Sequence, residues 1–343
     1  MPGVLRYAGG LCAVTIALAL AGGPSAAAAV PDGPRLAVVK WDFLLERQVL
    51  ESVNHKGALP LRLAGGGERK RPLPELFETP SWSHDGSQIA FSGVAHSLEA
   101  GPRGNRLYVV GADGRGLKSL PGTRGALQPV FSPDATSIAF TRSRRRGASI
   151  WLSPLARGAP SRLTAIRRGL YMLPSSFSPD GGTLLASRFV EGRAWEDIVA
   201  VDMGSGTVKT VLRRASEPIY SPDGTKLALV RWRPTRYRDG TPTASSDIYT
   251  ARSDGTGVRR VTRTHLQDEG YPSWDPSGER LAFVRNLPEP TENDLIELGI
   301  GASVMQVNAD GSCLRQIVEP SPVGVYGALW QPGPGREAGR IVC

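Results

Sequence analysis

The sequence predicts an all-β fold built from a repeated four-stranded unit, and three observations lead to this prediction. A tight-turn sequence of the type Ser-Pro-Asp-Gly recurs along the chain and is clearest at Ser221 to Gly224. Apolar segments of strand length flank the copies, and an aromatic residue precedes each turn at intervals of 43 to 56 residues. Proline, aspartate and glycine in this order favour a turn between antiparallel strands. A period of roughly 40–50 residues is typical of the blades of a β-propeller.

The hairpin signature has five clear copies and one degenerate copy. The clear copies begin at Pro80, Pro129, Pro174, Pro218 and Pro272, and the degenerate copy begins at Ala328. The aromatic residues that mark the blade starts are Trp82, Phe131, Phe177, Tyr220, Trp274 and Trp330. We expect these aromatic side chains to pack between blades rather than to form a platform for stacking sugars.

Each hairpin is followed by a third and a fourth predicted strand, most clearly after Tyr220. There the second strand is predicted at Leu227 to Val230, the third at Asp247 to Ala251 and the fourth at Arg259 to Thr262. The turn Ser253-Asp254-Gly255 joins the last two. The other third strands are predicted at Leu107 to Val110, Ile150 to Leu152, Asp197 to Val201 and Val304 to Val307.

The two ends of the repeat region are complementary. Leu36 to Lys40, Val49 to Val53 and Leu61 to Leu63 indicate a blade that lacks its first strand. Ala328 to Trp330 indicates a first strand with no blade behind it. Pairing the strand near Trp330 with the N-terminal blade Leu36–Leu63 would remove two exposed sheet edges. The sequence therefore predicts a six-bladed propeller of four-stranded antiparallel blades, closed by this pairing and forming one domain over residues 30–343.

The first residues are typical of a secretory signal peptide, predicted at residues 1–29. Arg6 precedes the apolar run Leu11 to Ala21, and an alanine tract ends at Ala29. The alternative is an uncleaved anchor, but the apolar run is shorter than the ~20 residues that span a bilayer. We expect a secreted or extracytoplasmic protein, periplasmic in a Gram-negative cell, with no transmembrane span after cleavage.

Export would leave two cysteines, Cys313 and Cys343, because Cys12 lies in the predicted signal peptide. Two cysteines in an exported protein can form a disulfide. The alternative is two unpaired thiols, since the sequence does not give the Cα separation that a disulfide requires.

The repeated Pro-x-aromatic-Ser-Pro-Asp-Gly, followed by Leu/Ile-Ala-Phe, resembles the WD-like repeat of the TolB-type propellers, periplasmic binding proteins of the Tol-Pal system. The resemblance covers about Leu36 to Gln331. The same hairpin occurs in propellers of prolyl oligopeptidase-like enzymes. Those enzymes add a hydrolase domain, and this chain has no Gly-x-Ser-x-Gly. TolB adds an α/β domain before its propeller, for which we expect no counterpart here, so the resemblance concerns the propeller alone.

Basic residues recur at one position of the predicted second strands, in a chain of formal net charge +9. These residues are Lys40, Arg142, Arg188, Arg231 and Arg285. If the blades are equivalent, they form a ring at the mouth of the face that carries the longer loops. Such a ring would bind anions, because guanidinium groups match phosphate and carboxylate geometry and their fields sum. The alternative is that the arginines only solvate strand ends.

Residues for catalysis or metal binding are not indicated, so we predict no catalytic residue, metal or cofactor. The four histidines, His55, His84, His96 and His265, show no ligand spacing. The recurring aspartates Asp85, Asp134, Asp180 and Asp223 are explained by their turn positions.

These features predict an exported, non-catalytic and monomeric binding or scaffold protein. We expect its partner to be a protein or an anionic polysaccharide or other polymer of the envelope or exterior, recognised on the long-loop face. Nucleic acid is disfavoured by export and by the lack of a basic groove interleaved with aromatic residues. The alternative function is a propeller enzyme, either a glycan lyase or glycosidase or a metal-dependent lactonase-type hydrolase, with its site at the channel mouth.

Overall fold

A computed structural model describes residues 35–42, 47–54, 56, 60–64, 78–94, 104–144, 147–237, 239–286, 302–321, 325–332 and 340–343. All of them lie within one compact unit, Asp32–Cys343. The predicted signal peptide, the segment Gly65–Pro74 and the loop 287–301 fall outside the described residues. In the described part of the chain no helix is long and apolar enough to cross a membrane.

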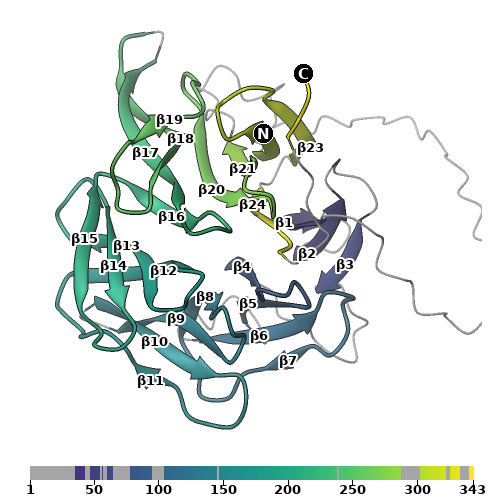
Figure 1. Cartoon of the computed structure of the whole chain (residues 1–343), viewed down its shortest axis with the longest axis vertical. Helices are drawn as coiled ribbons and strands as arrows, with labels where there is room; N and C mark the ends of the chain where they lie inside the picture. The colour runs from purple at the N-terminus through teal and green to yellow at the C-terminus, as the bar shows by residue number, and fades with distance from the viewer. Residues whose placement is uncertain are drawn as a thin grey trace, which may run out of the picture. The chain divides into compact units, whose positions relative to one another are not determined.

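Five sheets hold all the strands of the described residues, and four of these sheets are four-stranded (Figure 1). Three follow the chain in order. The first contains β4 (Glu78–Trp82), β5 (Gln88–Val94), β6 (Asn105–Gly111) and β7 (Lys118–Ser119). The second contains β16 (Ser216–Tyr220), β17 (Lys226–Arg236), β18 (Pro242–Arg252) and β19 (Arg259–Arg260). The third contains β20 (Asp268–Trp274), β21 (Arg280–Asn286), β22 (Ala302–Asn308) and β23 (Arg315–Ser321).

The eight-stranded sheet consists of two groups of four strands. One group is β8 (Ala126–Phe131), β9 (Ser137–Arg144), β10 (Gly147–Pro154) and β11 (Ser161–Arg162). The other is β12 (Leu170–Phe177), β13 (Thr183–Val190), β14 (Asp197–Asp202) and β15 (Val208–Arg213). A single parallel pair, Gly147 with Leu170, connects β10 to β12. Each group otherwise has the antiparallel order of the four-stranded sheets.

The remaining sheet combines strands from both ends of the repeat region. Its order is β24 (Val325–Trp330), β1 (Arg35–Asp42), β2 (Arg47–Asn54) and β3 (Leu61–Ala64). The β24 and β1 strands pair antiparallel, with Leu36 opposite Trp330. The backbone N–H of Gln331 also donates to the carbonyl of Arg35 at 2.7 Å. The N-terminal strands thus obtain their first partner from residues almost three hundred positions later in the sequence.

The hairpin turns owe their geometry to a serine and an aspartate. In the turn at Ser221, the hydroxyl donates to Asp223 at 2.5 Å and accepts from the backbone N–H of Lys226 at 3.0 Å. The other Asp223 bonds come from the N–H of Thr225 at 3.1 Å and from its hydroxyl at 2.8 Å. These bonds, the serine hydroxyl first, lower the pKa of Asp223. The aspartate therefore serves the turn, as the sequence predicted.

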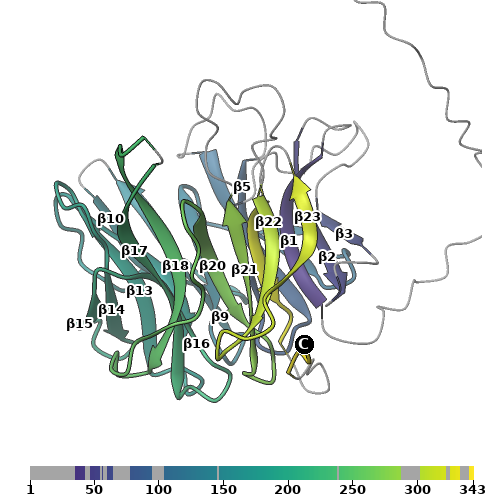
Figure 2. The same ribbon diagram turned by 90° about the horizontal axis from the view of Figure 1, so that it is seen from above.

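Six hydrophobic clusters of the described residues hold neighbouring groups of strands together, and each contains one of the repeated aromatic residues. Trp82 belongs to a cluster with Ala37 and Leu50 of the terminal sheet and Phe91 of β5. The other clusters contain Trp330, Trp274, Phe131, Phe177 and, partly buried, Tyr220. Figure 2 shows the sheets side by side in this face-to-face packing. The aromatic residues thus pack between sheets, and their burial removes large apolar areas from water.

Glycines let the outer edges of neighbouring sheets approach closely. Gly206, Gly255 and Gly311 occupy the turns between third and fourth strands, with φ of 69°, 84° and 89°. A Cβ at Gly255 would lie 2.6 Å from the carbonyl oxygen of Val211 in β15. A Cβ at Gly206 or Gly311 would meet the backbone oxygen of Leu163 or Val261 just as closely. A side chain at these positions is excluded both by φ and by the next sheet.

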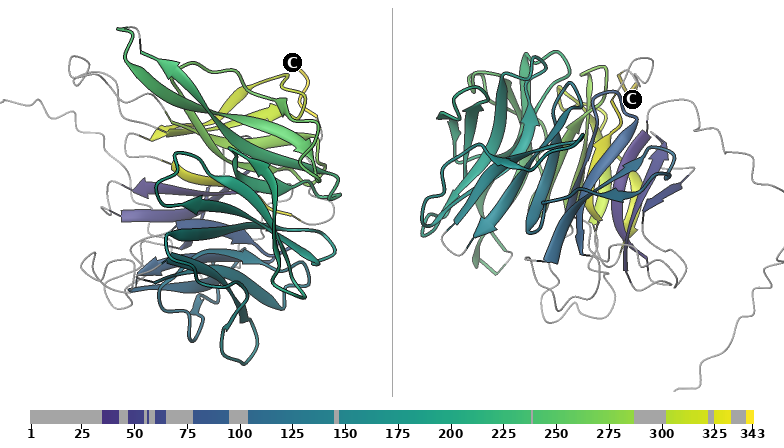
Figure 3. Two further views of the ribbon diagram at one scale, coloured as in Figure 1. Left: turned by 90° about the vertical axis from the view of Figure 1, so that its left-hand side faces the viewer. Right: turned by 90° about the horizontal axis from the view of Figure 1, so that it is seen from below.

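The hairpin of β17 and β18 is longer than the sequence predicted. The predicted strands Leu227–Val230 and Asp247–Ala251 are parts of strands of 11 residues each, whose pairing continues to Arg236 and Pro242. In Figures 1 and 3 this green hairpin reaches beyond its neighbours. Its additional residues are mostly polar or proline, with Trp232 and Ala244 as exceptions, which hid the strand from a hydrophobic pattern. The predicted fourth strand Arg259–Thr262 is shorter and ends at Arg260.

A disulfide joins Cys313 to Cys343, with their Cα atoms 5.3 Å apart. Asn308 reinforces this attachment of the C-terminal residues. Its side chain donates to the carbonyl of Ile341 at 2.9 Å and accepts from the Ile341 N–H at 2.8 Å. The final residues are thus held against the turn that follows β22.

Replacing Gly255 by alanine should destabilise the protein by about 2–4 kcal/mol, from positive φ and overlap with the Val211 carbonyl together. Gly192→Ala is the matched control, because Gly192 has φ of 81° and nothing within 4 Å of an added Cβ. It should cost only about 1–2 kcal/mol. Urea unfolding measures both changes, and equal losses would contradict the role assigned to the contact between sheets.

Candidate functional site

A central cavity of about 440 Å³ lies among the described residues. Residues of six strands line it, and we call β4, β8, β12, β16, β20 and β24 the inner strands. In Figure 1 they lie closest to the centre of the unit. Prolines and the repeated aromatic residues form much of the wall. Ligand sites in proteins commonly have volumes of roughly 300–1,000 Å³ and mainly apolar walls. We call this cavity the channel cavity.

Three residues reach the channel cavity from irregular positions of the inner strands. Gln128, Glu217 and Tyr271 have φ of 50°, 53° and 55°, and each directly precedes a proline. The strand register shifts at each of these positions, which marks a β-bulge. Positive φ is costly for residues with a side chain, by about 1–3 kcal/mol each. The bulges place three chemically different side chains at equivalent positions of the cavity wall.

Glu217 lies deep in the wall but keeps partial access to the channel cavity. One carboxylate oxygen accepts a hydrogen bond from the backbone N–H of Tyr271. The Glu217 N–H donates to the hydroxyl of Ser187 at 2.8 Å. The pKa of Glu217 is raised to about 7, mainly by loss of hydration; the Tyr271 N–H opposes this increase, and the charge of Glu196 contributes to it. Glu217 therefore titrates near neutral pH.

Glu196 is the second carboxylate of the cavity wall and directly precedes β14. Burial raises its pKa, and a hydrogen bond with Ser187 acts in the opposite direction. Ser187 thus lies between the two glutamates. Within the described residues no arginine or lysine forms an ion pair with Glu196 or Glu217.

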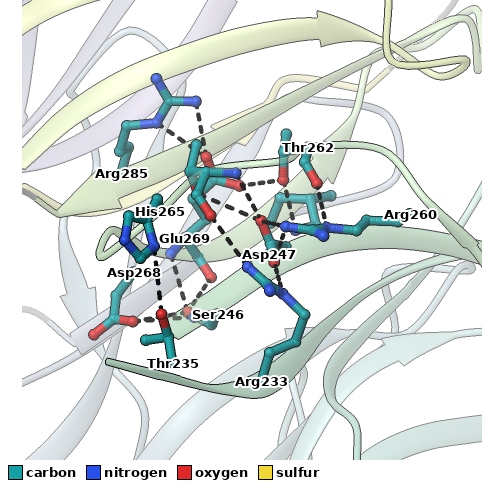
Figure 4. A network of polar contacts seen from close by, with 12 residues as sticks. Arg233, Thr235, Ser246, Asp247, Arg260, Thr262, His265, Asp268, Glu269 and Arg285 are labelled. Carbon is teal, nitrogen blue, oxygen red and sulfur yellow. Dashed lines mark hydrogen bonds and ion pairs between the residues drawn. The ribbon is translucent and has the colours of Figure 1, made fainter. Parts of the chain in front are cut away.

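Three fully buried carboxylates of this protein, Asp247, Glu269 and Asp275, have cationic partners. Figure 4 shows two of them in one network, where Asp247 contacts Arg233 at 2.5 Å and Arg260 at 2.9 Å. Glu269 accepts from the Nε and Nη2 of Arg285 at 2.9 and 2.8 Å. The side chains of Asp247 and Glu269 are both fully buried. Burying charges in this way is tolerated because each is paired and hydrogen-bonded.

The predicted basic ring consists of Lys40 and four arginines. Lys40 pairs through its backbone with Val49, but its side chain lies outside what the structure describes. Arg142 is buried and donates to the carbonyl of Gly122. Its guanidinium carbon lies 4.3 Å from the centre of the Trp151 ring. It therefore contributes to packing within its own sheet.

The other three arginines also have partners close to their own strands. Arg188 contacts Asp197 at 2.9 Å. Arg231 donates to the carbonyl of Arg214 at 3.3 Å. Arg285 is bound to Glu269, and neither it nor the other three described arginines lines the channel cavity. The anion-binding ring therefore stays a prediction.

The remaining predicted positions show no catalytic grouping. The exposed His84 lines one end of the channel cavity, and the exposed His265 lies 3.4 Å from the hydroxyl of Thr235. His55 and His96 are outside the described residues. Among the residues that the structure describes, no group of three or more histidine, cysteine, aspartate or glutamate side chains could hold a metal ion.

Sequence reasoning did not identify Glu196 and Glu217. A usable signal was present, because the residue before the repeated proline differs in every clear copy. These residues are Thr79, Gln128, Leu173, Glu217 and Tyr271. A position that varies while its neighbours repeat is not required by the blade, so it is available for recognition.

The repeat region matches a known protein family and several known proteins. The family model described as the TolB beta propeller domain matches residues 94–315, more than half of the chain. An uncharacterized protein of Agrobacterium fabrum is 30% identical over 220 residues, covering 62% of this chain and 66% of its own length. A TolB homolog of Chlorobium luteolum is 29% identical over 289 residues, covering 76% of this chain and 61% of its own.

A solved structure agrees with this fold. The crystal structure of TolB from Acinetobacter baumannii matches with a TM-score of 0.65 at 22% sequence identity. The match covers 88% of this chain and 67% of that chain. The protein thus shares its fold with a TolB propeller, while it spans only about two thirds of the length of these relatives.

Arg285→Ser should lower the free energy of unfolding by about 3–5 kcal/mol, because it leaves the buried carboxylate of Glu269 without its cation. Arg231→Ser is the control, since Arg231 has no acidic partner in the structure and should change stability by less than about 1 kcal/mol. Denaturant unfolding distinguishes the two. A similar, small effect for both would show that Arg285 does not stabilise the fold through Glu269.

Glu217→Gln should stabilise the protein at alkaline pH and have little effect near pH 5. The folded-state pKa of Glu217, about 7, lies above the ordinary value of 4.5. Its contribution to stability is therefore complete below the unfolded-state pKa and is lost as pH rises through about 7. Glutamine cannot ionise, so the variant should gain about 2–3 kcal/mol over the wild type between pH 5 and pH 9.

Thermal or urea unfolding at several pH values measures this gain. Glu279→Gln, on an exposed side chain, is the control for the loss of one negative charge. If the difference between Glu217→Gln and the wild type did not change with pH, burial of Glu217 as an unpaired acid would be refuted.

Proposed function

We propose, from the premise that the chain belongs to the TolB beta propeller domain family, that it is an exported binding protein without catalysis of its own. We further propose that it receives part of its partner in the channel cavity. The observation that carries this proposal is one cavity lined from all six inner strands, into which non-repeated side chains project. The partner would be a protein or a polymer of the envelope or exterior.

The proposal includes a closed ring of six blades. It is supported by the antiparallel pairing of β24 with β1 and by the division of the eight-stranded sheet into two groups of four. The six hydrophobic clusters also support it, because each contains one repeated aromatic residue and joins two neighbouring groups of strands. A closed ring would keep the inner strands at a fixed distance from the axis, which a preformed binding cavity requires.

Export is supported by two independent features. The first 29 residues carry the charge, apolar run and alanine tract of a signal peptide. The disulfide between Cys313 and Cys343 suits an oxidising compartment. A partner outside the cytoplasm follows from export, and so does the preference for envelope components over nucleic acid.

The second candidate function is an acid–base enzyme, and Glu196 and Glu217 are the observation that favours it. Two carboxyl groups with raised pKa values in a cavity are the equipment of general acid–base catalysis near neutral pH. We rank it second because no group of three or more possible metal ligands occurs among the described residues. Release of reducing sugar ends from acidic glycans, abolished by Glu217→Gln, would reverse this ranking.

Photocrosslinking in the cell that produces the protein tests binding in the channel cavity. Benzoylphenylalanine at Tyr271, which lines the cavity and is 37% exposed, should give a specific adduct. The same group at Leu314, which is 43% exposed and lies away from the cavity, is the control. An adduct at position 271 that is absent at 314 supports the proposal. No adduct at 271, or the same adducts at both positions, would reject the channel cavity as the binding site.

A further inference from the structure

We propose that the channel cavity binds an alkylammonium group, of the kind carried by aliphatic diamines and polyamines and by lysine side chains. This inference rests on the proposed function, because it assigns a ligand chemistry to the same cavity. The residues that would hold the ammonium group are Glu217 and Glu196, assisted by Gln128 and Tyr271.

The first argument is that two carboxylates of the cavity wall lack a cationic partner among the described residues. The protein carries 41 lysines and arginines against 32 acidic residues, so a cationic partner for a carboxylate is easily supplied. Asp247 and Glu269 each have one. Within the described part of the chain Glu196 and Glu217 have none, and both keep access to the cavity. A ligand cation would occupy the position that an arginine side chain takes beside the other buried acids.

The second argument is an acceptor that has no donor. The Oε1 atom of Gln128 is buried and has no hydrogen-bond partner, and Gln128 lines the same cavity. Of the three tryptophans in the wall, Trp82 donates its indole N–H to the Leu329 carbonyl and Trp274 to the Ile219 carbonyl, whereas the buried Nε1 of Trp330 has no partner among the described residues. Buried acceptors without donors are costly, so a ligand that brings several N–H donors is favoured.

The third argument distinguishes an alkylammonium group from other cations. The wall between the acids is formed by prolines and aromatic rings, which suits an aliphatic stem. Tyr271 and Tyr220 add ring faces that attract a cation. Calcium and magnesium require about six to eight oxygen ligands, more than two glutamates and one amide supply. An ammonium group has three donors and needs no such shell.

Binding should strengthen as pH rises from 6 to 8. Glu217 must be ionised to pair with the ligand, and its pKa of about 7 lies within this interval. Among the described groups, Glu196 is the one whose charge acts on Glu217, and the contact from β20 is the uncharged N–H of Tyr271. An alkylammonium ligand stays protonated throughout, since its pKa is roughly 10. The pH dependence would therefore report the protein and not the ligand.

Calorimetric titration of the intact protein with cadaverine and with a lysine-containing hexapeptide tests the inference. An identical peptide with Nε-acetyl-lysine is the control ligand. We expect saturable binding that weakens at least tenfold in Glu217→Gln and in Glu196→Gln. Glu279→Gln, which removes an exposed carboxylate outside the cavity, should bind as the wild type does. Affinity of the wild type should increase severalfold from pH 6 to pH 8.

The outcomes distinguish the sources of the ligand and the two proposals. Binding of cadaverine alone identifies a small amine, and binding of the peptide alone identifies a lysine-bearing segment. Binding of neither overturns the inference, as does equal binding of the acetylated peptide or retention of affinity in Glu217→Gln. Calcium binding that competes with cadaverine and depends on Glu217 would replace it with a divalent-cation site. If crosslinking at Tyr271 succeeds while no amine binds, only this inference fails and the channel remains the binding site.

Discussion

The fold depends on one constraint, which is that the apolar faces of each sheet must be buried against the neighbouring sheets. Each hydrophobic cluster combines residues from two groups of strands, so no group completes its core alone. The repeated aromatic residue lies at the inner end of each cluster, beside the channel cavity. The glycine turns, such as Gly255 against Val211, maintain the same packing at the outer edge. The cavity is the space that remains where the inner strands converge.

This constraint explains how much could be predicted from the sequence. Turn residues such as Ser221 and Asp223 act locally, so their function can be derived from spacing alone. The pairing of Leu36 with Trp330 was also predictable, because two incomplete repeats were complementary. Both features belong to the part of the chain that repeats, where each copy provides independent support for the others.

The rest depends on contacts between residues that no local pattern connects. Arg285 was predicted to belong to an anion-binding ring or to solvate a strand end, but Glu269 lies opposite it across two paired strands and binds it. The long β17–β18 hairpin was missed because its extension, including Arg236 and Pro242, has no hydrophobic alternation. Glu217 does not follow from the repeat. It occupies the position before the proline, where the residue type changes from blade to blade. Repeated positions identify the framework of strands and turns. Positions that vary between copies of the repeat identify side chains that are available for ligand binding.

Glu217 combines two unfavourable features that the fold alone does not require. Pro174 lies as far before Phe177 as Glu217 lies before Tyr220, and proline cannot adopt positive φ, so a blade can be built without that backbone conformation. Arg285 beside Glu269 shows that this chain can neutralise a buried acid with its own residues. At Glu217 the strained backbone and the unpaired carboxylate occur together, beside an accessible cavity. A different residue could have avoided the positive φ, and a basic side chain could have neutralised the carboxylate. Their occurrence together at Glu217 is expected where a site is organised for a ligand that supplies the missing positive charge.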